Sequence, residues 1–139
     1  MADNNIIVFP LNRIEYDIIV DPDCEREIYD IVSKSGLLER FYSDYEYRIR
    51  LLAEYRDRAP IFHSKWFEKL TRPHKKSLYS LHMARINNLR ILYSIGDRII
   101  LLCAFAEKQP ATRKRQSYMQ YTPIADARLK KYEEADTDE

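Results

Sequence analysis

Hydrophobic and polar residues alternate from Ile14 to Val20. After Val20 the hydrophobic residues recur every three or four positions, the spacing of a helix. The alternating stretch predicts a β-strand near the start of the chain. The segment DPDCEREIYDIVSKSG that follows predicts a helix, because Asp21 can cap it, Pro22 suits its first position and Gly36 can end it. The chain is therefore expected to open with a strand and a helix.

A longer helix is expected after Gly36. Large apolar residues recur there at intervals of three and four, with arginines and acids between them, until Ala59-Pro60 stops the pattern. This apolar stripe consists of Leu38, Phe41, Tyr45, Ile49, Leu52 and Tyr55. We interpret the next segment, FHSKWFEKL, as one more short helical piece, which makes two or three helices in this half of the chain.

The second half of the chain changes to the alternating spacing of strands. SLYSLHM and NLRILYSI each place large apolar residues at every second position. RIILLCAFA is apolar on both faces and is therefore expected inside the sheet. Gly96-Asp97 lies between the last two segments and predicts a tight hairpin, so three antiparallel strands are expected.

Arg90 is the charged residue inside the first strand of this hairpin. A two-residue turn would place Arg90 opposite Cys103. The apolar face of the strand should pack on the helices, so Arg90 is expected on the opposite, more exposed face of the sheet. A purely structural role stays open, in which Arg90 packs its methylenes on neighbours and pairs with a carboxylate such as Glu107.

A C-terminal helix completes the predicted fold. Thr122 and Pro123 are expected to cap it after a basic connection, and its side chains Ile124, Leu129 and Tyr132 can pack on the sheet. The order of elements predicts an α+β fold with an N-terminal strand, two to three helices, an antiparallel sheet of about four strands and a C-terminal helix. The helices are expected on one face of the sheet, with the other face open.

Composition and length predict a single folded domain. The chain has 139 residues, 45% of them apolar and 32% charged, and one domain over residues 1–139 is expected, with residues 134–139 as a disordered acidic tail. No segment approaches the roughly 20 apolar residues that cross a bilayer, and the N-terminus lacks the features of a secretion signal. The cytoplasm is the expected location, and no membrane partner is expected.

The two cysteines do not indicate a metal site. Cys24 and Cys103 are far apart and lack both the CxxC spacing and the neighbouring histidines of metal ligands. We expect both to remain reduced thiols, with Cys103 as a small core residue. No metal ion or other cofactor is expected.

Charge is unevenly distributed along the chain, although the net charge is only +1. Residues 1–63 carry 8 lysines and arginines against 13 aspartates and glutamates, residues 64–115 carry 12 against 3, and residues 116–139 carry 3 against 6. The net charges of the three segments are therefore −5, +9 and −3. A basic block between acidic ones suits a surface that contacts phosphate, although acidic segments that neutralise it across space would give the same pattern.

Three segments in the second half resemble, in this order, the RelE/ParE toxin superfamily, and in particular its phage-derived, HigB-like branch. They are LYSLH, LRILYSIGDRIILLCAFAEK and YTPIADARLKKY. That branch typically has a strand ending in Leu-Tyr-x-Leu-Arg, an Arg-Ile-Leu-Tyr strand, a hydrophobic strand finishing in Phe-x-Lys-Lys, and a helix bearing Ala and Arg. The resemblance covers roughly residues 75–132, and the preceding half agrees in the order of its elements.

The resemblance implies the toxin of a type II toxin–antitoxin system, a metal-independent endoribonuclease that cleaves mRNA on the ribosome. Family members contact the scissile phosphate with an arginine on the strand that Arg90 matches. Attack by the ribose 2′-hydroxyl places extra negative charge on that phosphate, which a fixed guanidinium stabilises. The match to Phe-x-Lys-Lys makes Lys108 a second candidate, as charge stabiliser or, with a lowered pKa, as base.

Two positions depart from the family's pattern. Glu107 stands at the first lysine of Phe-x-Lys-Lys, and His82 stands at the arginine of Leu-Tyr-x-Leu-Arg. His82 can act as an acid or base near neutral pH, or can be a hydrogen-bonded structural residue. Tyr118 and Tyr121 can stack on a base or donate a proton, or can simply pack. The catalytic candidates are Arg90, Lys108, His82 and Tyr121.

The remaining basic residues of the second half favour contact with the backbone of rRNA or mRNA over catalysis. These residues are Lys75, Lys76, Arg85, Arg98, Arg113, Lys114 and Arg115. The resemblance also implies partners: a cognate antitoxin, expected to be a helix-turn-helix protein, the ribosome and mRNA. Promoter DNA would be bound only through the antitoxin complex.

Two other functions stay open beside the mRNA endonuclease. The first keeps the fold without the chemistry, as a ParE-like toxin that binds DNA gyrase. The second is a non-toxic phage-derived protein whose basic face binds nucleic acid or a protein partner.

Overall fold

A computed structural model of the chain describes residues 10–73 and 75–137. The strands are β1 (Ile18–Val20), β2 (Phe67–Lys69), β3 (Tyr79–Met83), β4 (Leu89–Ile95) and β5 (Ile99–Ala106). The α-helices are α1 (Pro22–Ser35), α2 (Leu38–Tyr55), α3 (Ala59–Phe62) and α4 (Lys114–Thr137). Short 3-10 helices cover Ile14–Tyr16, Arg56–Arg58 and Ala111–Arg113.

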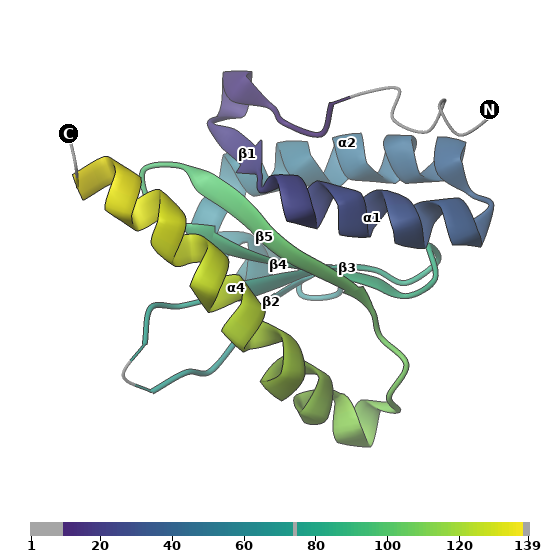
Figure 1. Cartoon of the computed structure of the whole chain (residues 1–139). Coiled ribbons are helices and arrows are strands. Elements are labelled where there is room, and N and C mark those ends of the chain that lie inside the picture. The colour runs from purple at the N-terminus through teal and green to yellow at the C-terminus, as the bar shows by residue number, and fades with distance from the viewer. Residues whose placement is uncertain (1–9, 74, 138–139) are drawn as a thin grey trace.

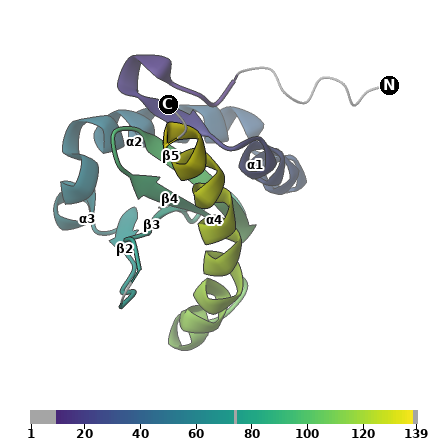
Figure 2. The ribbon, with the colours of Figure 1, turned by 60° about the vertical axis from the view of Figure 1, so that its left-hand side comes forward.

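The strands form an open, mixed sheet with helices on both faces. Their order is β1-β5-β4-β3-β2, and β1 runs parallel to β5 while all other neighbours are antiparallel. Helices α1 and α2 lie along one face and α4 crosses the other, as Figures 1 and 2 show from two sides. The predicted α+β class is confirmed, and the sheet has five strands instead of about four.

Helix α1 follows its local signals. The Asp21 carboxylate accepts hydrogen bonds from the backbone N–H groups of Asp23 and Cys24, at 3.0 and 3.4 Å, and so satisfies two otherwise unpaired donors of the first turn. Pro22 occupies the first position, and Gly36 ends the helix with a φ of 73°, in the left-handed region that favours glycine. These predictions are confirmed.

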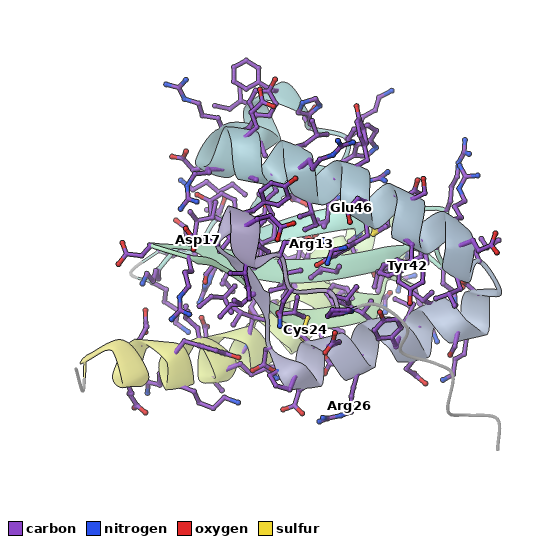
Figure 3. All side chains as sticks on the ribbon, turned by 90° about the horizontal axis from the view of Figure 1, so that it is seen from above. Arg13, Asp17, Cys24, Arg26, Tyr42 and Glu46 are labelled. Atoms are coloured by element: carbon purple, nitrogen blue, oxygen red, sulfur yellow. The ribbon has the colours of Figure 1, made fainter. Side chains whose placement is uncertain are left out.

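Helix α2 also follows its predicted stripe, since Phe41, Tyr45, Ile49 and Leu52 are fully buried. It ends at Tyr55, ahead of the predicted stop, because a 3-10 turn intervenes before α3. Near the start of the chain, Arg13 and Glu46 of α2 point toward each other in Figure 3. Arg13 Nε donates to Glu46 Oε1 at 3.1 Å, which ties the segment before β1 to α2.

Two predictions at the sheet edges were wrong. The segment from Ile14 to Val20 is a strand only at β1, because residues 14–16 turn as a 3-10 helix. In the segment FHSKWFEKL, Phe62 ends helix α3, and Phe67–Lys69 forms the edge strand β2 instead of a helix. Phe67 there is buried against the α1 and α2 side, and Glu68 points to the other face, where it meets residues of β3.

The predicted pairing of Arg90 with Cys103 was also wrong. The hairpin turn has three residues, since Ile95 pairs with Ile99, and β5 contains one extra residue at a bulge. Leu102 is the extra residue, because Leu92 pairs with Cys103 and Tyr93 pairs with Leu101. These two shifts place Arg90 opposite Phe105.

The face of the sheet that carries Arg90 is not open, because helix α4 covers it. The second face of β4 and β5 is itself apolar and has to be buried. It packs on α4 in a second core, formed by Leu70, Leu78, Leu92, Ile100, Leu102, Cys103, Phe105, Tyr118, Ala125 and Leu129. Tyr132 packs on this core as predicted, whereas Ile124 is exposed.

Helix α4 begins earlier than its sequence signals predicted. It starts at Lys114, so Thr122 does not cap it and Pro123 lies inside it. Because proline has no N–H, α4 lacks one backbone hydrogen bond at that point. The helix runs to Thr137, so the expected disordered tail is helical up to that residue, and residues 138–139 lie outside the described residues.

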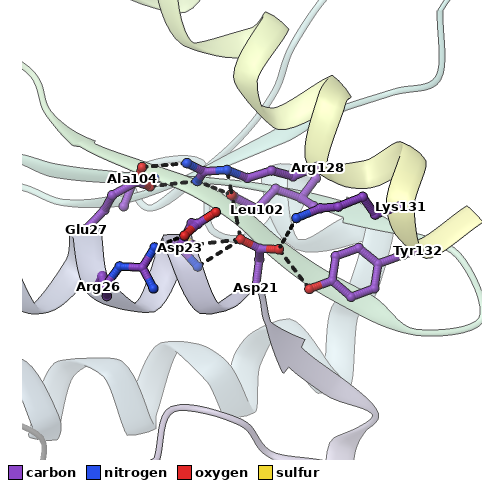
Figure 4. Close-up of polar contacts among 10 residues, drawn as sticks. Asp21, Asp23, Arg26, Glu27, Leu102, Ala104, Arg128, Lys131 and Tyr132 are labelled. Carbon is purple, nitrogen blue, oxygen red and sulfur yellow. Dashed lines mark hydrogen bonds and ion pairs between the residues drawn. The ribbon is translucent and has the colours of Figure 1, made fainter.

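A network of polar side chains joins α4 to α1 and to the bulge in β5 (Figure 4). Arg128 Nη1 and Nη2 donate to the two carboxylate oxygens of Glu27, at 2.9 and 2.8 Å. Nη1 also donates to the carbonyl of Leu102 at 2.8 Å, which the bulge leaves outside the regular ladder. Tyr132 donates to the buried Asp21 carboxylate at 2.9 Å. The helix cap of α1 therefore also holds the C-terminal helix.

Candidate functional site

Three strands and α4 bring four polar side chains to one place on the second face of the sheet. Arg90 of β4 and His82 of β3 are directly opposite each other. Glu68 of β2 pairs with Ser80, two residues from His82, so that its side chain reaches the same face. Tyr118 comes from the second turn of α4 and lies over these residues. We call Glu68, His82, Arg90 and Tyr118 the tyrosine cluster.

The Tyr118 hydroxyl is the centre of the tyrosine cluster. It accepts a hydrogen bond from Arg90 Nη1 at 2.8 Å and donates one to Glu68 Oε1 at 3.0 Å. His82 Nε2 lies 3.3 Å from the same hydroxyl and 3.4 Å from Glu68 Oε1. The cluster thus holds a cation, a carboxylate, an imidazole and a phenol in mutual contact.

Burial sets the electrostatics of the cluster. Tyr118 is only 9% exposed, and burial raises the pKa of its hydroxyl, while the Arg90 guanidinium acts in the opposite direction. The phenol therefore keeps its proton near neutral pH. Arg90 is half-buried, and its Nε has no hydrogen-bond partner among the described residues.

The cluster lies between two hollows of the surface. One, of about 530 Å³, contains Glu68 and Tyr118 and lies between the β2 segment and α4, where Lys69, Arg72 and Arg115 also line it. The other hollow, of about 550 Å³, contains His82 and lies between α2 and the end of β3. A molecule in either hollow would contact one side of the cluster.

Two of the predicted catalytic residues lie apart from the cluster. Lys108 and Tyr121 line a third hollow, of about 510 Å³, on the side of α1. Tyr121 stacks on Phe105 with ring centroids 4.2 Å apart, and Phe105 is the cross-strand neighbour of Arg90. Among the described residues, no hydrogen bond or ion pair joins Lys108 or Tyr121 to the cluster. The fold therefore brings Arg90 and His82 together and places Lys108 and Tyr121 outside the cluster, in a separate hollow.

Glu107 is not the partner of Arg90. Its Oε1 accepts hydrogen bonds from Ser117 Oγ at 2.6 Å and from the backbone of Gln109 at 2.9 Å. The carboxylate is buried and holds the connection between β5 and α4. Arg90 is fixed by Tyr118 instead.

The predicted RNA-binding residues fall into two groups. Lys75 and Lys76 pair with carboxylates of α4, at 3.6 Å from Asp126 and 2.7 Å from Glu133, so acidic residues neutralise part of the basic block across space. Lys114 begins α4, and its side chain lies outside the described part. The others are exposed: Arg85, Arg98, Arg113 and Arg115.

Sequence reasoning missed Glu68 and did not select Tyr118. Glu68 was hidden by the helical interpretation of its segment, because an edge strand of three residues has almost no periodic signal. Tyr118 had a usable signal. Tyr118, Tyr121, Ala125, Leu129 and Tyr132 follow helical spacing, which predicts a helix that begins ahead of Pro123.

Within residues 10–73 and 75–137, no helix is both long and apolar enough to cross a membrane. The described side chains include no group of three or more His, Cys, Asp or Glu residues that could hold a metal ion. No protein-family model, curated protein or solved structure matches the chain.

Proposed function

We propose that the protein is the toxin of a type II toxin–antitoxin pair and that it cleaves mRNA on the ribosome. The observation that carries the proposal is the surroundings of Arg90, on the strand that resembles the phosphate-binding strand of the RelE/ParE superfamily. An imidazole, a carboxylate and a phenol meet beside its guanidinium. The order of a strand, helices, antiparallel strands and a C-terminal helix agrees with the resemblance.

The tyrosine cluster contains the groups that RNA cleavage needs. In the proposed reaction the ribose 2′-hydroxyl attacks the adjacent phosphorus, the bond to the 5′-oxygen breaks, and a cyclic phosphate forms. His82 takes the proton of the 2′-hydroxyl, and Glu68, 3.4 Å from Nε2, stabilises the imidazolium. Arg90 stabilises the negative charge that builds up on the phosphate.

Tyr118 supplies the second proton of the reaction. Its phenol, kept neutral by burial, donates to the leaving 5′-oxygen. His82 Nε2 carries a hydrogen and lies 3.3 Å from this hydroxyl, so it can pass that hydrogen to the tyrosine after Nδ1 has taken the proton of the 2′-hydroxyl. Arg90 retains donors for the phosphate, because only Nη1 of its guanidinium has a hydrogen-bond partner among the described residues.

The proposed partners follow from this function. The ribosome would present the mRNA, and exposed arginines such as Arg85 and Arg115 would contact RNA backbone. A cognate antitoxin of the helix-turn-helix class would silence the toxin, and promoter DNA would be bound through the antitoxin complex.

One observation favours a second candidate, a toxin or phage-derived protein that only binds its target, such as DNA gyrase. Helix α4 lies over Arg90, and the Tyr118 hydroxyl occupies one of its donors. A phosphate must therefore enter beside Tyr118 or displace it. If it does neither, the cluster is a polar anchor for α4 and the protein acts by binding alone.

Primer extension on a reporter mRNA in a reconstituted translation system, with and without ribosomes, tests the proposal. We expect cuts only with ribosomes, and a loss of about a hundredfold or more in the rate with Arg90→Gln, His82→Gln or Tyr118→Phe. Lys108→Ala tests the predicted role of the lysine. Arg50→Gln is the matched control, because Arg50 is exposed on α2 and distant in sequence from the cluster.

Circular dichroism would establish that each variant folds. An absence of cuts by the folded wild-type protein on ribosomes contradicts the endonuclease proposal. Inhibition of gyrase supercoiling by the same preparation would then support the binding toxin.

A further inference from the structure

The hollow on the His82 side of the tyrosine cluster is strongly basic. It is formed by α2, by the segment before β2 and by the turn after β3. Its charged side chains, which lie beside His82, are the four cations Arg40, Arg48, Lys65 and Arg85 and the carboxylate of Asp44. Their net charge is +3. We call it the α2 hollow. Two of these cations come from the acidic first segment of the chain, so the charge pattern along the sequence did not point to it.

An arginine stacked on an aromatic ring lines the α2 hollow. The guanidinium carbon of Arg48 lies 4.5 Å from the centroid of the Trp66 ring. The imidazole of His63 stacks parallel to the same ring, with centroids 5.9 Å apart, and Tyr47 meets it edge-on at 5.8 Å. These contacts hold the Arg48 guanidinium in one orientation before any ligand arrives.

The cations of the α2 hollow are not neutralised by close hydrogen bonds. Arg40 and Arg48 lie 3.7 Å from the same Asp44 oxygen, longer than a hydrogen bond, and Arg48 Nε is buried without a partner among the described residues. Burial lowers the pKa of Arg48 because it takes the guanidinium away from water. A negative charge beside this buried cation is therefore favourable. Lys65 and Arg85 are exposed and have no ion pair in the described part of the chain.

We propose that the α2 hollow binds the sugar–phosphate backbone of single-stranded RNA on its way to the tyrosine cluster. This inference rests on the proposed function and adds the path of the substrate, since His82 lines the hollow and also contacts Tyr118. A planar guanidinium pairs with phosphate oxygens through two parallel donors. The stacked, fixed guanidinium plane of Arg48 also offers a surface on which an RNA base can stack, and the exposed ring of Tyr47 offers a second such surface.

Single-stranded RNA fits these features better than an acidic protein segment does. An acidic peptide would use the cations but would leave the Arg48 plane and the Tyr47 ring without a stacking partner. Stacking on aromatic and guanidinium planes is what single strands contribute beyond their charge.

The single tryptophan of the chain, Trp66, reports on the α2 hollow directly. The experiment titrates the full-length protein with a short fluorescent single-stranded RNA that carries 2′-O-methyl riboses and cannot be cleaved. Anisotropy gives the affinity, and tryptophan fluorescence shows whether the RNA enters the hollow. The double variant Lys65→Glu, Arg85→Glu reverses two exposed charges, and Arg50→Glu reverses one on the outer side of α2.

We expect RNA to change the Trp66 fluorescence and the double variant to bind RNA at least about tenfold more weakly. The slope of log affinity against log salt concentration should also fall by roughly 1.4, about 0.7 for each lost phosphate contact. Arg50→Glu should stay within about twofold of the wild type, since a single peripheral charge is largely screened. Equal affinity in the double variant and the control, or unchanged tryptophan fluorescence, overturns the proposal. So does an equal response to polyglutamate, which would assign the hollow to an acidic protein.

The two proposals fail separately in this design. Binding of uncleavable RNA through the α2 hollow does not depend on catalysis, so it can be observed even if no mRNA is cut. Ribosome-dependent cleavage combined with unchanged RNA affinity of the double variant would retain the endonuclease and reject the hollow.

Discussion

The Tyr118 hydroxyl joins three side chains with a single proton. Because it donates to Glu68, its oxygen must accept from both Arg90 and His82, and the hydrogen of the imidazole is then on Nε2. One hydroxyl thus orients a guanidinium and an imidazole at the same time. Its removal would leave three largely buried polar groups without their common partner, which costs more than one ordinary hydrogen bond.

Tyr118→Phe is therefore expected to lower the free energy of unfolding by about 1–3 kcal/mol, as measured by urea denaturation. The ring keeps its edge contact with Phe105, so packing is preserved. Tyr121→Phe is the matched control, because the Tyr121 ring stacks on the same phenylalanine and its hydroxyl has no hydrogen bond among the described residues. Equal effects of the two substitutions would show that the cluster does not stabilise the fold.

At the scale of the elements, the parts that could be predicted are those specified by neighbouring residues. Helix α1 is bounded by Asp21, Pro22 and Gly36, which act within one turn of its ends. Strand β2 has only three residues and depends on pairing with β3, whose paired residues lie 10 to 14 positions further along the chain. Helix α4 was predicted too short because Pro123 resembles a helix start, while the apolar face that α4 covers keeps the helix intact around it.

The same distinction explains which parts of the site could be predicted. The alternation of β4 placed Arg90 on the face that points away from α1 and α2, and the structure adds that His82 of β3 lies opposite it. The bulge at Leu102 could not be predicted, because the Leu102 carbonyl is satisfied by Arg128, which lies 26 residues further along the chain, in α4. The pairing of Arg90 with Phe105 depends on that bulge.

The Arg128 contacts predict how α4 is attached. Arg128→Met would leave the Leu102 carbonyl without this donor and the Glu27 carboxylate with the backbone N–H of Ala104 as its remaining donor. We expect a loss of about 2–3 kcal/mol in the free energy of unfolding. Lys131→Ala removes a 3.6 Å ion pair of a side chain that is 60% exposed, and should cost less than about 1 kcal/mol. If Arg128→Met leaves the free energy of unfolding unchanged in the same urea denaturation, the view that this network holds the helix is contradicted.

On the scale of the whole molecule, the sheet is covered on both faces by different parts of the chain. Helices α1 and α2 bury one face, and α4 buries the other with residues that follow the last strand. The acidic residues of α4 also neutralise Lys75 and Lys76, while the cations of the α2 hollow lie on the other side of the tyrosine cluster. The helix therefore completes the core and neutralises part of the basic block, while the α2 hollow beside His82 keeps a net charge of +3.

Removal of α4 tests whether it is part of the core or a cover over Arg90. A chain that ends at residue 113 would expose the second core, including Leu92, Leu102 and Phe105, and we expect it to aggregate or to lose cooperative unfolding. A chain that ends at residue 134 keeps Arg128 and Tyr132 and should unfold close to the full-length protein in urea. Size-exclusion chromatography and circular dichroism distinguish these outcomes. A monomeric, cooperatively folded chain ending at residue 113 would mean that α4 is a removable cover, and Arg90 would then be open to solvent on its own sheet.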